Sequence, residues 1–319
     1  MSTYNPDQAL EKEGSHKITS HPERRWAIKW VVYLVMVVVC NINSEKPPHL
    51  EHVMRKKIKI GALISGGGSN LQAIIDACES GSIHGRVVFA GSDNPAASGL
   101  GRARQYGIPC FTVDYDAIAQ KVKADPSQAR YPKDLDMDHV FSTMMSTGRH
   151  QNSESLSAFL RTRIQAEIRL LEHLALYSFD LLVLAGFMRT LTPYFIDRIN
   201  DPPETQRIMN IHPALLPAFP GVDGYGDTFR YGCKVGGCTV HFVDYGEDTG
   251  PIIGQAFFEI AETDDLDAIR KKGLVEEWRL YPKCIQYAAE GRLKAEQMTY
   301  RLKNGKTIQR TVVKVLPRT

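Results

Sequence analysis

The feature that most constrains this chain is an alternation, from residue 58 onward, of short apolar runs with segments of helical periodicity. The clearest run is FDLLVLA at 179–185, which is apolar at nearly every position. A strand of this kind must be covered on both faces, as in a parallel sheet flanked by helices. The pattern therefore predicts an α/β fold with a mostly parallel, twisted sheet and helices on both faces.

The expected elements follow the same alternation. Besides the strand at 179–185, strands are expected at 58–64, 87–90, 109–113, 207–211, 238–243 and 252–260, and helices at 71–79, 97–107, 155–177 and 266–290. Residues 114–155 are polar and contain no convincing strand, so they are interpreted as a surface insertion in a domain spanning 58–291. In the tail at 292–319, Asn304-Gly305 between two alternating segments predicts a β-hairpin with a type I′ turn.

Residues 1–57 are interpreted as an N-terminal extension outside the fold. Their run WVVYLVMVVVC at 30–40 has eleven apolar residues, whereas a membrane-spanning helix needs about 20. No membrane insertion is therefore expected. A signal-peptide core of this length stays open, although the following NINS is a poor cleavage site. Met54 as the true start is a further alternative, and residues 1–53 are then expected to be dispensable for activity.

Charge and cysteine content argue against nucleic-acid binding and against a metal site. The net charge is +3, but residues 58–291 alone sum to −7, which argues against a nucleic-acid binder because such proteins present a basic face. The chain has six cysteines and no C-x-x-C pair. They are interpreted as reduced thiols in a cytoplasmic protein, and no metal site is expected.

A glycine-rich loop, SGGGSN at 65–70, joins the first expected strand to the first helix. Gly67 and Gly68 let a ligand approach the backbone closely, and Ser69 or Asn70 is expected to cap the helix. Exposed N–H groups at a helix start suit a phosphate. The dinucleotide fingerprint fails at Leu71, and the Walker motif fails because the loop has no lysine. The alternative is a tight turn without a ligand.

Polar residues follow two later strands. Asn210 and His212, two residues apart at a strand end, point to the same side. An asparagine amide can stabilise an oxyanion, and a histidine can carry a proton. Asp248 lies in an acidic turn, where a carboxylate beside His212 would orient its ring and favour its charged form. A capped strand end and a solvated turn are the alternatives, and His241 is interpreted as a structural strand histidine.

Four segments taken together resemble the phosphoribosylglycinamide formyltransferases of the folate-dependent formyltransferase family. They are SGGGSNLQAIIDA (65–77), LAGFMRTLTP (184–193), NIHPALLPAFPG (210–221) and GCTVHFVDYGEDTGPII (237–253). The resemblance implies a Rossmann-like formyltransferase fold. It also implies transfer of a formyl group from the co-substrate 10-formyltetrahydrofolate to the amine of a small-molecule substrate, glycinamide ribonucleotide, in purine synthesis, with no metal. Monomer and homodimer both remain open.

The resemblance also implies roles by position. The catalytic set is Asn210, His212 and Asp248. The ribonucleotide site comprises Gly67, Gly68, Ser69, Asn70, Pro213 and the pair Glu276 and Glu277, of which Glu277 is favoured. The folate site comprises Met188, Arg189, Thr190, Leu191, Asn210, Asp244, Tyr245, Gly246, Glu247 and Asp248. An exposed Arg189 and a solvated glutamate pair are the alternatives.

Two departures from the family pattern stand out. Residues 222–231 read VDGYGDTFRY where the family has a histidine-containing helix start, and Arg161 is a candidate for its folate-contacting arginine. The remaining functional alternatives are formyltetrahydrofolate deformylase, which uses water as acceptor, and a nucleotide-binding module without turnover. A methionyl-tRNA formyltransferase would need an additional domain after residue 291, and 28 residues are insufficient.

Overall fold

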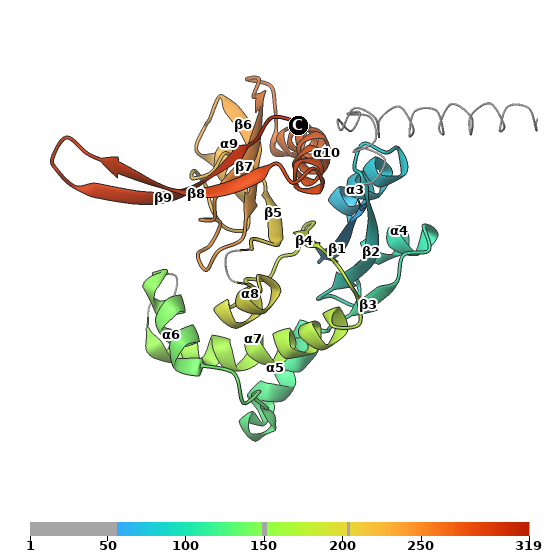
Figure 1. Ribbon diagram of the computed structural model, residues 1–319, viewed down its shortest axis with the longest axis vertical. Helices are drawn as coiled ribbons and strands as arrows, with labels where there is room; N and C mark the ends of the chain where they lie inside the picture. The colour runs from blue at the N-terminus through green and yellow to red at the C-terminus, as the bar shows by residue number, and fades with distance from the viewer. Residues whose placement is uncertain (1–55, 149–151, 203–204, 319) are drawn as a thin grey trace, which may run out of the picture. The chain divides into compact units, whose positions relative to one another are not determined.

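A seven-stranded sheet organises the chain in the computed structural model, which describes residues 56–148, 152–202 and 205–318 (Figure 1). Almost all of the N-terminal extension, including the apolar run at 30–40, lies outside the described residues. Within the described ranges, no helix is both long enough and apolar enough to cross a membrane.

The sheet has the order β3-β2-β1-β4-β5-β6-β7. Its first five strands pair in parallel, and the last two run antiparallel at one edge. The strands are β1 Ile58–Ile64, β2 Gly85–Ser92, β3 Cys110–Thr112, β4 Leu181–Leu184, β5 Ile208–His212, β6 Val235–Phe242 and β7 Ile252–Glu259. The predicted α/β fold with a mostly parallel sheet is confirmed.

Helices cover both faces, and β4 shows why its sequence is apolar throughout. Leu181 and Val183 pack into one core, and Leu182 and Leu184 pack into the other. The first core is covered by α3 (Ser69–Glu79), α4 (Gly99–Gln105) and α10 (Leu266–Ala289). The second is covered by α5 (Tyr115–Ala124), α7 (Ser153–Leu174) and α8 (Pro193–Ile199). With successive side chains on opposite faces, each strand position needs an apolar residue.

The segment at 114–155 is helical rather than a plain surface loop. It contains α5, the short 3₁₀ helix Pro126–Gln128, α6 (Met137–Ser146) and the start of α7. Val140 and Met144 of α6 are buried against Leu156 and Leu160 of α7. The interpretation as a surface insertion does not anticipate this small third core, whose buried residues are Val140, Met144, Leu156, Leu160, Ile164 and Tyr194.

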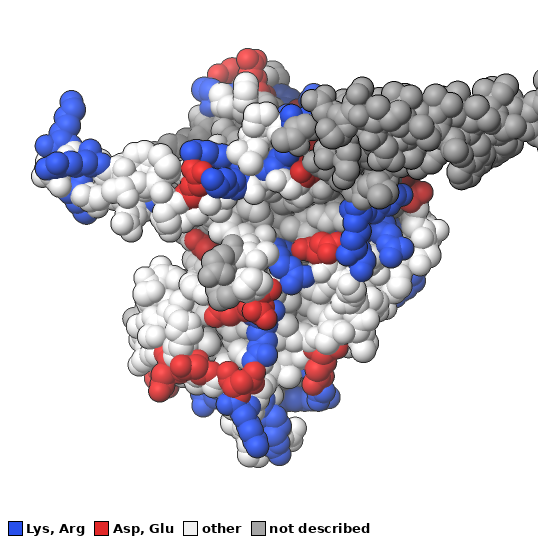
Figure 2. Space-filling model, in the orientation of Figure 1, with Lys and Arg blue, Asp and Glu red and all other residues white. Residues whose placement is uncertain are grey.

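The C-terminal hairpin is confirmed as β8 (Leu293–Arg301) paired with β9 (Thr307–Val315), but its turn is not type I′. Gly305 alone has positive φ, at 82°, and its N–H donates to the carbonyl of Leu302 at 2.9 Å. A type I′ turn needs positive φ at Asn304 as well, so the loop is the three-residue kind with glycine in the left-handed position. Figure 2 shows Lys and Arg side chains gathered at the far end of this hairpin.

The two-sided burial of β4 leads to a stability prediction. Leu182 has no exposed surface and Leu176 is 75% exposed. Leu182→Ala should lower the free energy of unfolding by about 2–5 kcal/mol, because truncation removes buried methyl groups and leaves a cavity. Leu176→Ala should change it by less than about 0.5 kcal/mol. Urea titration of the two variants checks this, and similar losses in both would contradict the assignment of β4 to the sheet centre.

Candidate active site

The strand order reverses at β1, and the loops that leave the sheet on the two sides of this point border a crevice. From β1 the sheet continues to β2 and β3 on one side, and through β4 to β5 on the other. At the carboxyl ends of these strands, the Ser65 N–H donates to the Gly186 carbonyl at 2.9 Å, and the Met188 N–H donates to Ser65 Oγ at 2.8 Å. Open α/β sheets bind ligands at such a switch point.

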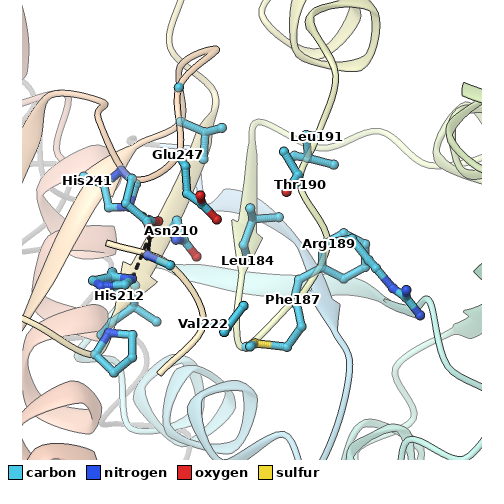
Figure 3. Close-up of a pocket in the computed structure, with 18 of the residues that line it drawn as sticks. Leu184, Phe187, Arg189, Thr190, Leu191, Asn210, His212, Val222, His241 and Glu247 are labelled. Atoms are coloured by element: carbon cyan, nitrogen blue, oxygen red, sulfur yellow. Dashed lines mark hydrogen bonds and ion pairs between the residues drawn. The ribbon is translucent and has the colours of Figure 1, made fainter. Parts of the chain in front are cut away.

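A cavity of about 150 Å³ lies on the β4–β5 side of this crevice (Figure 3). Its lining brings together three segments that the sequence singled out: the stretch after β4, the end of β5 and the acidic turn after β6. The lining residues are Leu184, Gly186, Phe187, Met188, Arg189, Thr190, Leu191, Asn210, Ile211, His212, Pro213, Gly221, Val222, His241, Val243, Asp244, Gly246, Glu247 and Asp248.

The buried ring of His212 has an acceptor at each nitrogen. Nε2 lies 2.8 Å from the Phe219 carbonyl oxygen, and Nδ1 lies 3.2 Å from Asp248 Oδ2. Because carbonyl and carboxylate oxygens only accept, both contacts are satisfied as hydrogen bonds when both ring nitrogens carry protons. Phe219 and Asp248 are also the two non-glycine residues with positive φ in the described chain, each at 54°. Such backbone strain gathers at functional sites.

His241 is the site residue that sequence reasoning missed. Asn210 and His241 are direct cross-strand partners in the β5–β6 pair. Nδ1 of His241 donates to the Phe242 carbonyl at 2.8 Å, and Nε2 lies 3.2 Å from the Asn210 amide nitrogen, which donates to it when the ring is neutral. Figure 3 shows Asn210, His212 and His241 clustered on one side of the cavity. The alternation of His241 with buried Val240 and Phe242 was the available signal, because it places the ring on the opposite face from them.

Asp248 contacts both histidines and the backbone. Oδ1 lies 3.6 Å from His241 Nε2, and Oδ2 also accepts from the Gly221 N–H at 2.9 Å. Burial alone would raise the pKa of the carboxyl, but the His241 contact, the charge of His212 and the Gly221 N–H outweigh it and hold the pKa below its ordinary value. Asp248 is therefore ionised at neutral pH and can support a positive ring beside it.

Arg189 faces away from the polar cluster. Its guanidinium pairs with Asp93 and with Asp116, the latter at 3.1 Å, and stacks over the Tyr115 ring. Figure 3 shows the side chain pointing out of the cavity. Arg189 is thus neither the exposed cation of the alternative interpretation nor a side chain aimed at a ligand here.

Unlike Arg189, which lines the cavity, the expected folate residues Tyr245 and Arg161 lie off it. The Tyr245 hydroxyl donates to Asp197 Oδ1 at 2.6 Å, and Tyr245 is not among the lining residues. Arg161 is exposed on α7, and its positive charge interacts electrostatically with Tyr131. Arg163, two positions further along α7, stacks over Tyr115 with its guanidinium carbon 5.2 Å from the ring centroid.

The glycine loop carries a correction. Gly68, at φ 67°, is the N-cap of α3, and neither Ser69 nor Asn70 caps it with a side chain. The Asn70 amide instead donates to Glu277 Oε2 at 2.6 Å. This partner lies 207 residues away, so local capping statistics do not anticipate it.

Glu277 links this loop to the segment at 222–231. It is buried and also accepts from the Tyr225 hydroxyl at 2.7 Å. Burial raises the pKa of the Glu277 carboxyl, and the two hydrogen bonds only partly oppose this. Glu276 pairs instead with Arg279 at 3.1 Å. At the start of α9 (Gly224–Arg230), a Cβ on Gly224 would lie 2.6 Å from the Pro213 carbonyl, so this helix packs directly on the cavity wall.

Comparison with known proteins decides the family. Residues 58–285 match the formyl transferase family. The chain belongs to this family.

Several proteins similar to this chain are named phosphoribosylglycinamide formyltransferase. The phosphoribosylglycinamide formyltransferase of Escherichia coli is 33% identical over 240 residues, which cover 75% of this chain and 91% of the relative. The Bacillus subtilis protein of the same name is 32% identical over 72% of this chain and 93% of its own length. The crystal structure of glycinamide ribonucleotide transformylase 1 from Symbiobacterium toebii superimposes with a TM-score of 0.59 at 36% identity, covering 82% of this chain and 95% of that one.

The ionised Asp248 gives a pH prediction. A carboxyl whose folded-state pKa is depressed stabilises the fold above its unfolded value of 3.8, and this contribution is lost as pH falls through the folded value. In Asp248→Asn the side chain keeps its size and shape, and asparagine adopts a positive φ more readily than most residues. It should cost about 1–3 kcal/mol of unfolding free energy near pH 7, and the difference from the unmodified chain should shrink below about pH 4.

Thermal unfolding between pH 3 and 8 measures this difference. Asp267→Asn is the matched control, because that side chain is 79% exposed and should show little change at any pH. A deficit in Asp248→Asn that stays constant down to pH 3 would contradict the ionised contact.

Proposed function

We propose that this chain transfers the formyl group of 10-formyltetrahydrofolate to the amine of glycinamide ribonucleotide, giving the formylated ribonucleotide and tetrahydrofolate in purine synthesis. The observation that carries the proposal is that Asn210, His212 and Asp248 line one cavity at the switch point of the sheet, where His212 contacts Asp248 and Asn210 contacts His241. The names and coverage of the relatives support the same reaction.

In the proposed reaction the substrate amine attacks the formyl carbon, and negative charge develops on the formyl oxygen. One N–H of the Asn210 amide is donated to His241, and the second is free to stabilise that oxyanion. The amine then loses a proton and N10 of the folate gains one as its bond to carbon breaks. His212 carries the proton once its Nε2 exchanges the Phe219 carbonyl for the substrate, and Asp248 at Nδ1 stabilises the charged ring while it does so.

The two substrates are assigned to different parts of the site. The folate lies along 188–191 and 244–248, which all line the cavity except Tyr245. The phosphate of the ribonucleotide lies at the Gly67–Asn70 loop, at the N-terminus of the eleven-residue helix α3. Glu277, hydrogen-bonded to Asn70, lies between the loop and the α9 wall, where it meets the glycinamide part.

The setting is proposed to be the cytoplasm, with small molecules as the partners. The five cysteines within the described residues, Cys78, Cys110, Cys233, Cys238 and Cys284, are free thiols, which suits a reducing compartment. In the part of the chain that the structure describes, no three His, Cys, Asp or Glu side chains are placed to hold a metal ion.

The direct test is to incubate the full chain with 10-formyltetrahydrofolate, with and without glycinamide ribonucleotide, and to follow tetrahydrofolate release. Release should depend on the ribonucleotide, and mass spectrometry should find the formyl group on its amine. Equal release without the ribonucleotide would indicate a hydrolase. No release in either arm would contradict the enzyme proposal.

The glycine loop offers a matched pair of variants. A Cβ on Gly67 would meet nothing within 4 Å, whereas a Cβ on Gly68 would lie 2.9 Å from the Gly99 backbone at a positive φ. Gly67→Val should therefore preserve the fold, crowd the phosphate, and raise the KM for the ribonucleotide about tenfold while the KM for folate changes less than twofold. Gly68→Ala should instead lower stability and disturb both substrates.

Steady-state kinetics with each substrate varied in turn measures both KM values. A Gly67→Val enzyme with normal stability and an unchanged KM for the ribonucleotide would refute phosphate binding at this loop.

A further inference from the structure

The cavity wall at 187–191 is a stretch without regular structure, and its position depends on what holds its two ends. At its start, Ser65 fixes Gly186 and Met188: its N–H donates to the Gly186 carbonyl at 2.9 Å, and its hydroxyl oxygen accepts from the Met188 N–H at 2.8 Å. At its other end comes Thr192, which directly precedes α8 and has no exposed surface. Whatever holds Thr192 therefore also sets the shape of the wall.

Thr192 is held by Glu167 of α7. Glu167 Oε1 accepts from the Thr192 N–H at 2.8 Å, and Oε2 accepts from the Thr192 hydroxyl. Glu167 is itself completely buried. One carboxylate thus fixes both the backbone and the side chain of the residue where the wall ends.

The contact between Glu167 and Thr192 lowers local stability in two ways. Thr192 occupies the N-cap position of α8, yet it makes no side-chain cap to that helix, and such a cap is commonly worth about 1 kcal/mol. A carboxyl without exposed surface also loses its hydration, and burial raises the pKa of Glu167 to about 7. Departures from local stability of this kind are expected at functional sites.

The groups around Glu167 modulate its charge but do not replace the contact. The positive charge of Arg163, on the same helix, favours the ionised form of Glu167 and lowers its pKa. Tyr115 of α5 and Tyr194 of α8 also interact with the carboxyl electrostatically. The two hydrogen bonds that Thr192 donates are accepted by Glu167 and not by any of these groups.

We propose that Glu167 is a positioning residue for the folate co-substrate, which holds the wall at 187–191 in its binding conformation through Thr192. The inference rests on the proposed function, because it assigns folate to that wall. Glu167 lies on α7, outside the motifs after β4, β5 and β6, and it touches neither the cavity nor the polar cluster.

Three variants separate positioning from general stability. Glu167→Gln keeps an oxygen for the Thr192 N–H and offers an N–H to its hydroxyl oxygen, so both hydrogen bonds are restored. Glu167→Leu removes both hydrogen bonds while it fills a similar volume. Leu170→Ala, one turn further on α7 and 1% exposed, weakens the same core without touching Thr192.

The measurements are the two KM values and kcat, the Kd of tetrahydrofolate by calorimetry, and hydrogen exchange of the amides at 187–192. Glu167→Leu should raise the KM and Kd for folate about tenfold, change kcat and the ribonucleotide KM less than threefold, and speed exchange at 187–192. Glu167→Gln should restore near-normal values. Leu170→Ala should lose stability with both KM values unchanged.

The outcomes also separate this inference from the proposed function. Failure of the unmodified enzyme to transfer formyl groups would overturn the function, while the tetrahydrofolate Kd and the exchange rates would still decide the role of Glu167. The positioning role is overturned if Glu167→Leu leaves the folate Kd unchanged, if Gln behaves like Leu, or if the unmodified chain does not bind tetrahydrofolate.

Discussion

The carboxylate of Asp248 is the interaction on which the rest of the site depends. It contacts His212 on β5, His241 on β6 and the Gly221 N–H in the loop between those strands. Three parts of the chain are thereby fixed around one partly buried negative charge. Asp248 reaches this place only with a positive φ, which costs local stability that these contacts offset. Asp248 therefore ties the His212 ring to the turn after β6 and to the loop at Gly221.

The sheet explains why such a cluster can exist at all. Parallel strands β1, β4 and β5 end at the same edge, so their loops meet there. The antiparallel strand β6 then brings His241 back beside Asn210 in direct register. Because the two buried cores hold the strands from both faces, the loops at that edge can carry polar and strained residues without loss of the fold.

Much of the fold could be predicted from the sequence, because apolar continuity in a strand such as Leu181–Leu184 reports burial on both faces. The spacing of Asn210 and His212 likewise predicted one shared direction. Contacts between distant elements could not be predicted in this way. Asn70 was expected to cap a helix, but it pairs with Glu277 in another part of the chain. Glu167 and Thr192 meet only because α7 packs under the start of α8.

The most direct measurement is a crystal structure of the chain with tetrahydrofolate and glycinamide ribonucleotide bound. We expect N10 of the folate and the substrate amine to meet within about 3–4 Å of the Asn210 amide and the His212 ring, with the phosphate at the Gly67–Asn70 loop. Folate bound away from the cavity at 188–191 and 244–248, or a phosphate held far from the glycine loop, would contradict this expectation.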